Sequence, residues 1–188
     1  MNWIEIAGFV CGVLGIWLTL RQNVWCFPVG LANVILSLFL FYEQKLYADS
    51  LQQIVYILLL AYGWFNWNSG KESSIKLAVS TSSRNLLFQS AIAFIMCTLL
   101  LGTILSHYTD AAFPWLDSTA TSLSFVAQWM IAKKKIENWW IWMVVNGMYI
   151  GIYLSKELWL YSLLFFIYLL LAISGYLTWR KQLDKLQV

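Results

Sequence analysis

The chain is built from a succession of long apolar runs separated by short polar breaks. Its last two runs, residues 138–154 and 158–179, are interrupted only by a brief charged break at 155–157. About 20 consecutive apolar residues cross a bilayer as a helix. Because lipid offers no hydrogen bonds to the backbone, a spanning segment must be a helix or part of a closed barrel. These runs therefore restrict the chain to very few folds.

Seven runs of roughly spanning length occur along the chain. They cover residues 3–20, 25–42, 48–68, 86–106, 115–132, 138–154 and 158–179. Only 11% of the residues are charged, against about 25% in a soluble domain. The runs are continuous and lack the alternation of barrel strands. We predict an all-α polytopic membrane protein with one domain over residues 1–188, an exposed loop over 68–85 and a polar tail from 180 onwards.

The basic residues are divided unevenly between the two sides of this predicted bundle. Ten of the 12 Lys and Arg residues fall in alternate connections and the C-terminal tail, whereas Lys45 and Lys156 fall on the other side. Basic residues are enriched in cytoplasmic loops. The distribution therefore predicts an N-terminus outside the cytoplasm and a C-terminus inside it.

The two ends of the chain resemble each other at a nearly constant offset in residue number, called the repeat spacing below. The pairs that share this offset are Trp3 and Trp115, Tyr47 and Trp159, Ser50 and Ser162, Gly63 and Gly175, and Trp67 and Trp179. Asn33 and Asn146 are one position further apart. A slip of one position before the third helix would reconcile the two offsets. The pattern predicts repeat one over 3–68, a linker helix over 86–106 and repeat two over 115–179.

Each repeat would contain three helices, called a triplet below. A single linker helix between the triplets would return the second one to the membrane orientation of the first. The repeats would then be parallel, a 3+1+3 arrangement like that of the SWEET transporters. In such proteins the substrate lies near the bilayer midplane between the repeats. We expect the linker helix to lie outside the pore.

Several polar side chains occur inside the predicted spans, where they must face the bundle interior or a cavity. Asn33 and Asn146 fit two interpretations equally: hydrogen bonds between helices, at about 0.6 kcal/mol each, or contacts with a substrate. For Gln53 a cavity is favoured. Gln128 and Tyr149 are further candidates, whereas Asp117 fits an interfacial position.

Two of the 12 tryptophans, Trp64 and Trp67, lie three positions apart on one helix face. Tryptophans near helix ends usually belong to an interfacial aromatic belt. The alternative is a stacking wall for a flat ring, including a cationic one, which the indole face attracts.

No motif for catalysis or for a cofactor is present. The sequence contains no HExxH, no phosphate-binding loop and no CxxC among its three cysteines. We expect no enzyme activity, no metal ion, no cofactor and no nucleic-acid partner. Without a nucleotide-binding motif or a chain of buried acids, facilitated diffusion is the expected mode of transport.

Certain short segments together resemble the Pnu family of vitamin transporters over nearly the whole chain. They are Trp3-Ile4-Glu5, Tyr62-Gly63-Trp64 with Trp67, the run from Phe113 to Ser118, and Glu137-Asn138-Trp139 followed by Asn146. The resemblance implies a homotrimer in the bacterial inner membrane. It also implies facilitated diffusion of an unphosphorylated vitamin, which a cytoplasmic kinase then traps. By position, it implies a substrate site that includes Gln53, Trp64, Trp67, Asn146 and Asn33.

The resemblance points first to nicotinamide riboside as substrate, a precursor for NAD biosynthesis. Thiamine is the alternative within the family, because both molecules carry a cationic aromatic ring. Gln128 departs from the family pattern, where an apolar residue is usual. A membrane scaffold without a substrate is a third interpretation, against which the repeat and the paired asparagines argue.

Overall fold

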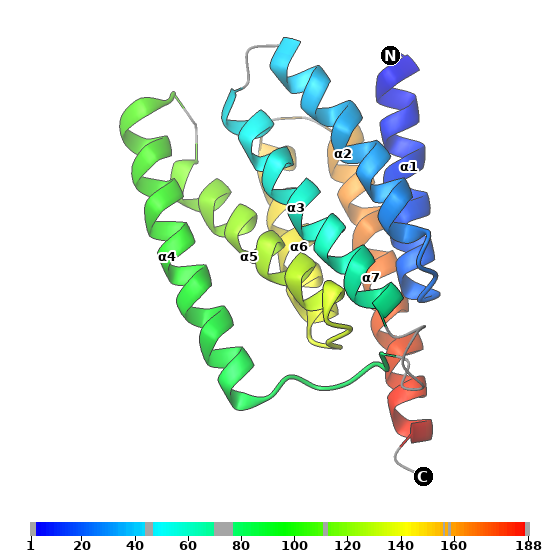
Figure 1. Cartoon of the computed structure of the whole chain (residues 1–188). Helices are drawn as coiled ribbons and strands as arrows, with labels where there is room; N and C mark the ends of the chain where they lie inside the picture. The colour runs from blue at the N-terminus through cyan, green and yellow to red at the C-terminus, as the bar shows by residue number, and fades with distance from the viewer. Residues whose placement is uncertain are drawn as a thin grey trace.

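The computed structural model describes residues 3–43, 47–69, 77–110, 113–155, 157 and 159–186. Seven α-helices make up this part of the chain, as the apolar runs predict. They are α1 (Trp3–Leu20), α2 (Cys26–Glu43), α3 (Tyr47–Ser69), α4 (Arg84–Tyr108), α5 (Pro114–Ala132), α6 (Asn138–Ser155) and α7 (Trp159–Leu186). Figure 1 shows them running up and down the molecule, with the two termini at opposite ends.

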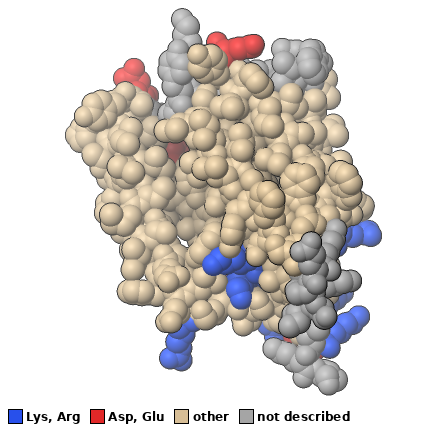
Figure 2. Space-filling model, in the orientation of Figure 1, with Lys and Arg blue, Asp and Glu red and all other residues tan. Residues whose placement is uncertain are grey.

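The outer surface of the bundle is apolar, as a bilayer requires. α4 exposes a row of large side chains, among them Phe88, Met96 and Leu100 at 62–69%. By length and composition, α4 and residues 161–185 qualify as membrane spans, and α1 and α2 contain shorter apolar helices. In Figure 2 the basic side chains gather at the lower end and acidic ones lie along the upper edge. The molecule thus has an apolar belt between charged ends.

Six of the described helices form a closed ring. In order, α1 contacts α2, α2 contacts α3, α3 contacts α5, α5 contacts α6, α6 contacts α7, and α7 returns to α1. Among these helices α4 packs only against α5, so it stands outside the ring (Figure 1). The fourth helix thus lies outside the ring, although its residues Leu101 and Leu105 line the cavity described below.

Aromatic rings fill the lower end of the ring in two similar units. Phe27 of α2 meets Trp67 of α3 edge to face, with centroids 4.9 Å apart and planes at 89°. Trp139 of α6 meets Trp179 of α7 in the same way, at 5.3 Å and 88°. The two units touch where the centroids of Trp67 and Trp179 lie 6.4 Å apart. These four residues, Phe27, Trp67, Trp139 and Trp179, are called the aromatic layer below.

A glycine makes room for one ring in each unit. A Cβ atom on Gly63 would lie 2.3 Å from the Phe27 ring, and one on Gly175 would lie 2.5 Å from the Trp139 ring. At the repeat spacing, Phe27 corresponds to Trp139 and Gly63 corresponds to Gly175. The second and third helices of each triplet therefore share one register. In that register the position equivalent to Asn33 is Val145, next to Asn146. The predicted slip before the third helix is therefore not needed for these packing pairs.

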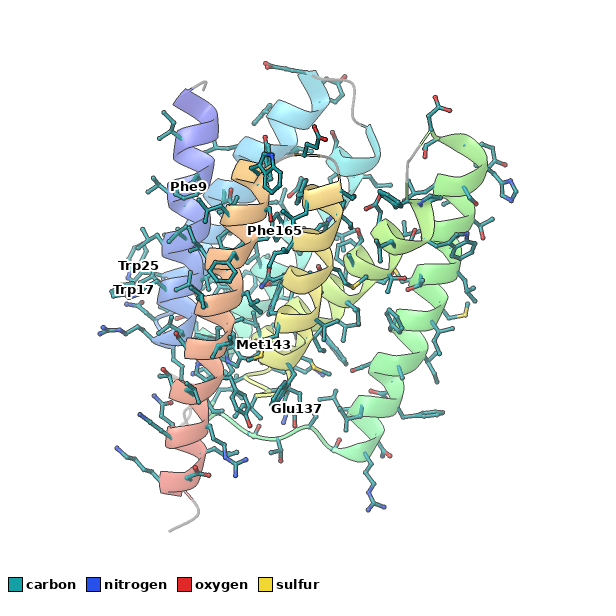
Figure 3. All side chains as sticks on the ribbon, turned by 180° about the vertical axis from the view of Figure 1, so that it is seen from behind. Phe9, Trp17, Trp25, Glu137, Met143 and Phe165 are labelled. Carbon is teal, nitrogen blue, oxygen red and sulfur yellow. The ribbon has the colours of Figure 1, made fainter. Side chains whose placement is uncertain are left out.

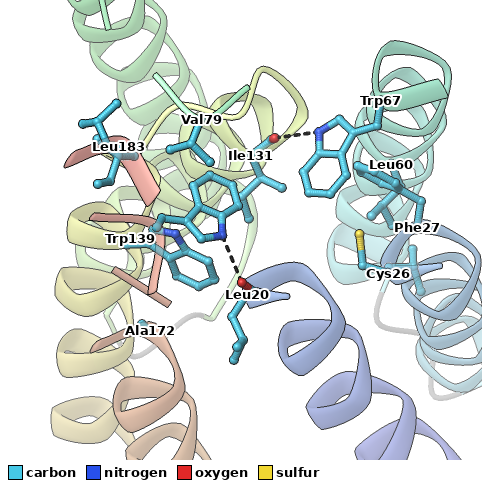
Figure 4. Packing of buried hydrophobic residues seen from close by; sticks show 13 residues of the cluster. Leu20, Cys26, Phe27, Leu60, Trp67, Val79, Ile131, Trp139, Ala172 and Leu183 are labelled. Atoms are coloured by element: carbon cyan, nitrogen blue, oxygen red, sulfur yellow. Dashed lines mark hydrogen bonds between the residues drawn. The ribbon is translucent and has the colours of Figure 1, made fainter. Parts of the chain in front are cut away.

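The two inner tryptophans of the aromatic layer also join the triplets by hydrogen bonds (Figure 4). Trp67 Nε1 donates to the carbonyl oxygen of Ile131 at 3.1 Å, and Trp179 Nε1 donates to that of Leu20 at 3.2 Å. Both acceptors lie in the last turn of a helix, where carbonyl groups lack partners within the helix. Each tryptophan therefore caps the first helix of the opposite triplet.

The predicted exposed loop over 68–85 is wrong for its second half. Val79 is buried in the cluster beneath the aromatic layer, and Ser80 pairs with the turn between α5 and α6. Lys134 in that turn donates to the carbonyl oxygen of Leu77 at 2.9 Å, and Glu137 accepts two bonds from Ser82. Burial lowers the pKa of Lys134 below its ordinary value. Buried backbone groups need hydrogen-bond partners, and those of this segment find them on the bundle, which holds the segment in place.

The predicted polar tail is helical for most of its length, because α7 continues to Leu186. Leu183 packs into the buried cluster. On the exposed side, Arg180 and Asp184 form an ion pair one turn apart, at 3.1 Å. The buried Leu183 and the ion pair thus stabilise the helix beyond its membrane-spanning residues.

We expect Gly63→Ala to lower the thermal stability of the purified protein. The added methyl group would overlap the Phe27 ring, and overpacking of this kind costs about 1–3 kcal/mol. Gly147→Ala is the matched control, since nothing lies within 4 Å of its added Cβ. Thermal unfolding in detergent should show a lower midpoint for the first variant only. Equal midpoints would contradict the packing described here.

Candidate functional site

The helices surround a partly open cavity of about 1150 Å³. Five of the seven predicted site residues line it: Asn33, Gln53, Gln128, Asn146 and Tyr149. They come from α2, α3, α5 and α6, so the fold brings together side chains that are far apart in sequence. Residues of α4 also line the cavity at the corner where α4 meets α5.

The amide side chains are the main polar groups of this cavity. Gln53 and Gln128 are 9% exposed and Asn146 is 3% exposed. Within the described part of the chain, none of these three amides, nor that of Asn33, has a hydrogen-bond partner. Their polar atoms are absent from the fully enclosed, unpaired atoms of the described residues, so they open into the cavity. Bonds between helices do not explain these amides, and a polar ligand or water in the cavity would satisfy them.

Aromatic rings from α6 and α7 form one wall of the cavity. Tyr149 and Phe165 have centroids 4.7 Å apart, and Tyr153 stacks on Phe165 at 5.3 Å with planes at 28°. Tyr168 meets the edge of Phe165 at 5.7 Å. Figure 3 shows Phe165 where α6 and α7 lie side by side. Flat rings stack on such walls, and aromatic faces attract cations.

The predicted stacking pair, Trp64 and Trp67, does not line this cavity. Trp67 is only 7% exposed and belongs to the aromatic layer, where Lys134 Nζ lies 4.4 Å from its ring centroid. Trp64 is 40% exposed on the outer side of α3. The two side chains lie three positions apart on one helix, but one is buried and the other is exposed, and neither lines the cavity.

Several lining residues escaped the sequence analysis, notably Tyr56, Phe125, Phe165 and Tyr168. Tyr56 and Phe125 meet edge to face at 5.3 Å across α3 and α5. A signal was available for two of them, because Tyr56 and Tyr168 are separated by the repeat spacing. In an aromatic-rich membrane sequence, periodicity alone does not separate such rings from those that face lipid.

The charged side chains that line the cavity are acidic. Asp110 and Asp117 line the cavity near α4, and its described lining contains no Lys, Arg or His. The basic groups gather at the opposite end of the molecule, beyond the aromatic layer (Figure 2). Among the described residues no cluster of three or more His, Cys, Asp or Glu suited to a metal ion occurs. The cavity therefore suits a neutral or cationic molecule better than an anion.

The cavity is closed at one end by the aromatic layer. Phe27 and Trp139 line it and are 1% and 2% exposed. At the other end the lining reaches Thr109 and Asp110, just beyond the C-terminus of α4. A molecule in the cavity would thus lie between a packed aromatic floor and an acidic upper end.

Comparison with known proteins identifies the family. A sequence profile described as nicotinamide mononucleotide transporter matches residues 2–181. The nicotinamide riboside transporter PnuC of Escherichia coli K12 is 28% identical, over 95% of this chain and 85% of its own length. The riboflavin/roseoflavin transporter RibM of Streptomyces davaonensis is 24% identical, over 77% of this chain and 68% of its own length.

A solved structure shares the fold. The crystal structure of the vitamin B3 transporter PnuC superposes with a TM-score of 0.76 at 22% identity, covering 97% of this chain and 83% of that one. The relatives are transporters, in agreement with the prediction that this chain is not an enzyme. Since the family profile matches almost from end to end, the chain belongs to the nicotinamide mononucleotide transporter family.

Proposed function

We propose that this protein carries nicotinamide riboside, an unphosphorylated vitamin, across the bacterial inner membrane. The observation that carries the proposal is the set of buried, unpartnered amides facing one cavity: Gln53, Gln128 and Asn146, with Asn33 beside them. Amides can bind the carboxamide and the sugar hydroxyls of the riboside, since they donate and accept hydrogen bonds. The similarity to PnuC transporters supports the same substrate.

The charge of the cavity supports a cationic, unphosphorylated substrate. The pyridinium ring of nicotinamide riboside would stack on the wall of Tyr149, Tyr153 and Phe165. Asp110 and Asp117 would favour its positive charge. A phosphate group would need Arg, Lys or a helix N-terminus as partner, and the described lining supplies no basic side chain.

The transport step is proposed to be facilitated diffusion. The centre of the cavity is lined by amides and aromatic rings, and its two lining carboxylates, Asp110 and Asp117, lie toward the α4 end. A proton or sodium pathway would need ionisable groups across the membrane. A cytoplasmic kinase would then trap the substrate, because the phosphorylated product would find no partner in the cavity.

The proposed architecture is two parallel repeats, residues 3–68 and 115–179, joined by the linker helix over 86–106 in a SWEET-like 3+1+3 order. The ring supports it, because every contact within the first triplet has its counterpart in the second. The two tryptophan bonds support it too, since each joins one triplet to the other. Repeats of this kind rock against each other around a central site.

The proposed orientation puts the C-terminus in the cytoplasm and the N-terminus in the periplasm. The basic end of the molecule (Figure 2) would then face the cytoplasm. The aromatic layer would close the cavity on that side, and the acidic end would face the periplasm. A homotrimer, implied by the family resemblance, belongs to the same proposal.

Thiamine and riboflavin are the competing substrates. Thiamine also carries a cationic aromatic ring, and riboflavin is suggested by the similarity to RibM. Calorimetric titration of the purified protein with each vitamin, and with nicotinamide mononucleotide, separates them. We expect heat from nicotinamide riboside and at least a roughly 100-fold weaker response to the mononucleotide, because a buried phosphate would lack a charged partner. Binding of thiamine or riboflavin alone would reject the proposed substrate.

We expect Asn146→Ala to weaken substrate binding by about tenfold or more, since a buried hydrogen bond to a ligand is worth about 1–3 kcal/mol when one partner is left unpaired. The thermal midpoint should change little, because the amide has no partner within the described part of the chain. Val144→Ala is the control on the same helix, with its side chain 55% exposed on the outer face. Unchanged affinity in Asn146→Ala would remove this residue from the site.

A further inference from the structure

The repeat spacing places a tyrosine at equivalent points of the two triplets. Tyr56 of α3 and Tyr168 of α7 are separated by that spacing, and both line the cavity. Their surroundings differ. The polar side chains of Ser124 and Gln52 lie beside the Tyr56 hydroxyl. This hydroxyl therefore has polar neighbours within the protein.

Tyr168 faces a glycine instead. The residue equivalent to Ser124 on α1 is Gly12, again at the repeat spacing. A Cβ atom on Gly12 would lie 2.6 Å from the Tyr168 hydroxyl oxygen and 3.6 Å from Cζ. Gly12 thus leaves room for the Tyr168 hydroxyl and has no side chain that could hydrogen-bond it. Within the described residues the Tyr168 hydroxyl has no hydrogen bond.

A second unpartnered group meets Tyr168 at the same glycine. Asn33 Nδ2 would lie 3.4 Å from the Cβ position of Gly12, and Asn33 Oδ1 lies 3.6 Å from that of Gly8. The hydroxyl and the amide therefore converge where α1, α2 and α7 meet. Both line the cavity, beside the aromatic wall that Phe165 and Tyr168 share. Free polar groups inside a membrane protein are costly and mark substrate contacts.

We infer that Tyr168 is a substrate-binding residue, whose hydroxyl bonds an uncharged oxygen of the substrate, such as a sugar hydroxyl, together with Asn33. The inference rests on the proposed function. Gly12 makes the contact possible, because it leaves space for the hydroxyl and has no side chain like that of Ser124, which lies beside Tyr56. The two halves of the site are thus chemically unequal, which gives the substrate one preferred orientation.

Nicotinamide riboside titrated into tyrosine variants tests the assignment. Tyr168→Phe should weaken binding about 3- to 10-fold, the loss of one hydrogen bond, with an unchanged thermal midpoint. Tyr161→Phe, on the outer face of the same helix at 53% exposure, should bind as the wild type does. Tyr56→Phe should lower the thermal midpoint and reduce affinity less than Tyr168→Phe. Equal affinity of Tyr168→Phe and wild type, or a greater loss in Tyr56→Phe, would overturn the inference.

Gly12→Ala supplies a second, independent readout. Its methyl group would displace the Tyr168 hydroxyl, so this change should also weaken binding. In a Tyr168→Phe background the same change should cost little more, because the clashing oxygen is gone and the remaining contacts are 3.4 Å or longer. Additive losses would contradict a role through Tyr168. If the wild type binds none of the vitamins, the proposed function fails together with this inference, whereas binding by the wild type with normal affinity in Tyr168→Phe rejects the inference alone.

Discussion

The structure depends on two tryptophan side chains that cap helices across the bundle. Trp67 and Trp179 each donate from Nε1 to a carbonyl oxygen in the last turn of a helix in the other triplet. Carbonyl groups at helix ends must find partners, and near a membrane they find few. Because the same rings pack edge to face on Phe27 and Trp139, one layer joins the two triplets and forms the floor of the cavity.

Above that floor the helices remain apart, and the cavity is lined by groups that the protein itself does not satisfy. Gln53, Gln128 and Asn146 are buried without partners among the described residues. A stable core would pair such amides or replace them with apolar side chains. Their place in the centre of the ring is the physical basis for the proposal that a polar substrate binds in this space. Aromatic rings and two carboxylates at the rim add a preference for a flat cation.

Local sequence patterns located much of this arrangement. The apolar runs predicted the helices to within a few residues. Polar residues inside spans identified most of the cavity amides, because lipid excludes such groups whatever the tertiary fold. The tryptophans were harder to interpret. A ring near a helix end satisfies an interfacial belt, a stacking wall and a packed layer equally well, and Trp67 belongs to the last of these.

The sequence by itself determined that the chain spans a membrane as helices, because its apolar runs are long enough to cross a bilayer and lack the alternation of barrel strands. It also contained the repeat spacing. Only the tertiary structure decided which side chains meet. Whether a tyrosine hydroxyl has a polar neighbour, as at Tyr56, or faces a glycine, as at Tyr168, depends on the residue that the neighbouring helix presents, Ser124 or Gly12. That choice is made by packing between helices that lie far apart along the chain, where no local pattern reaches.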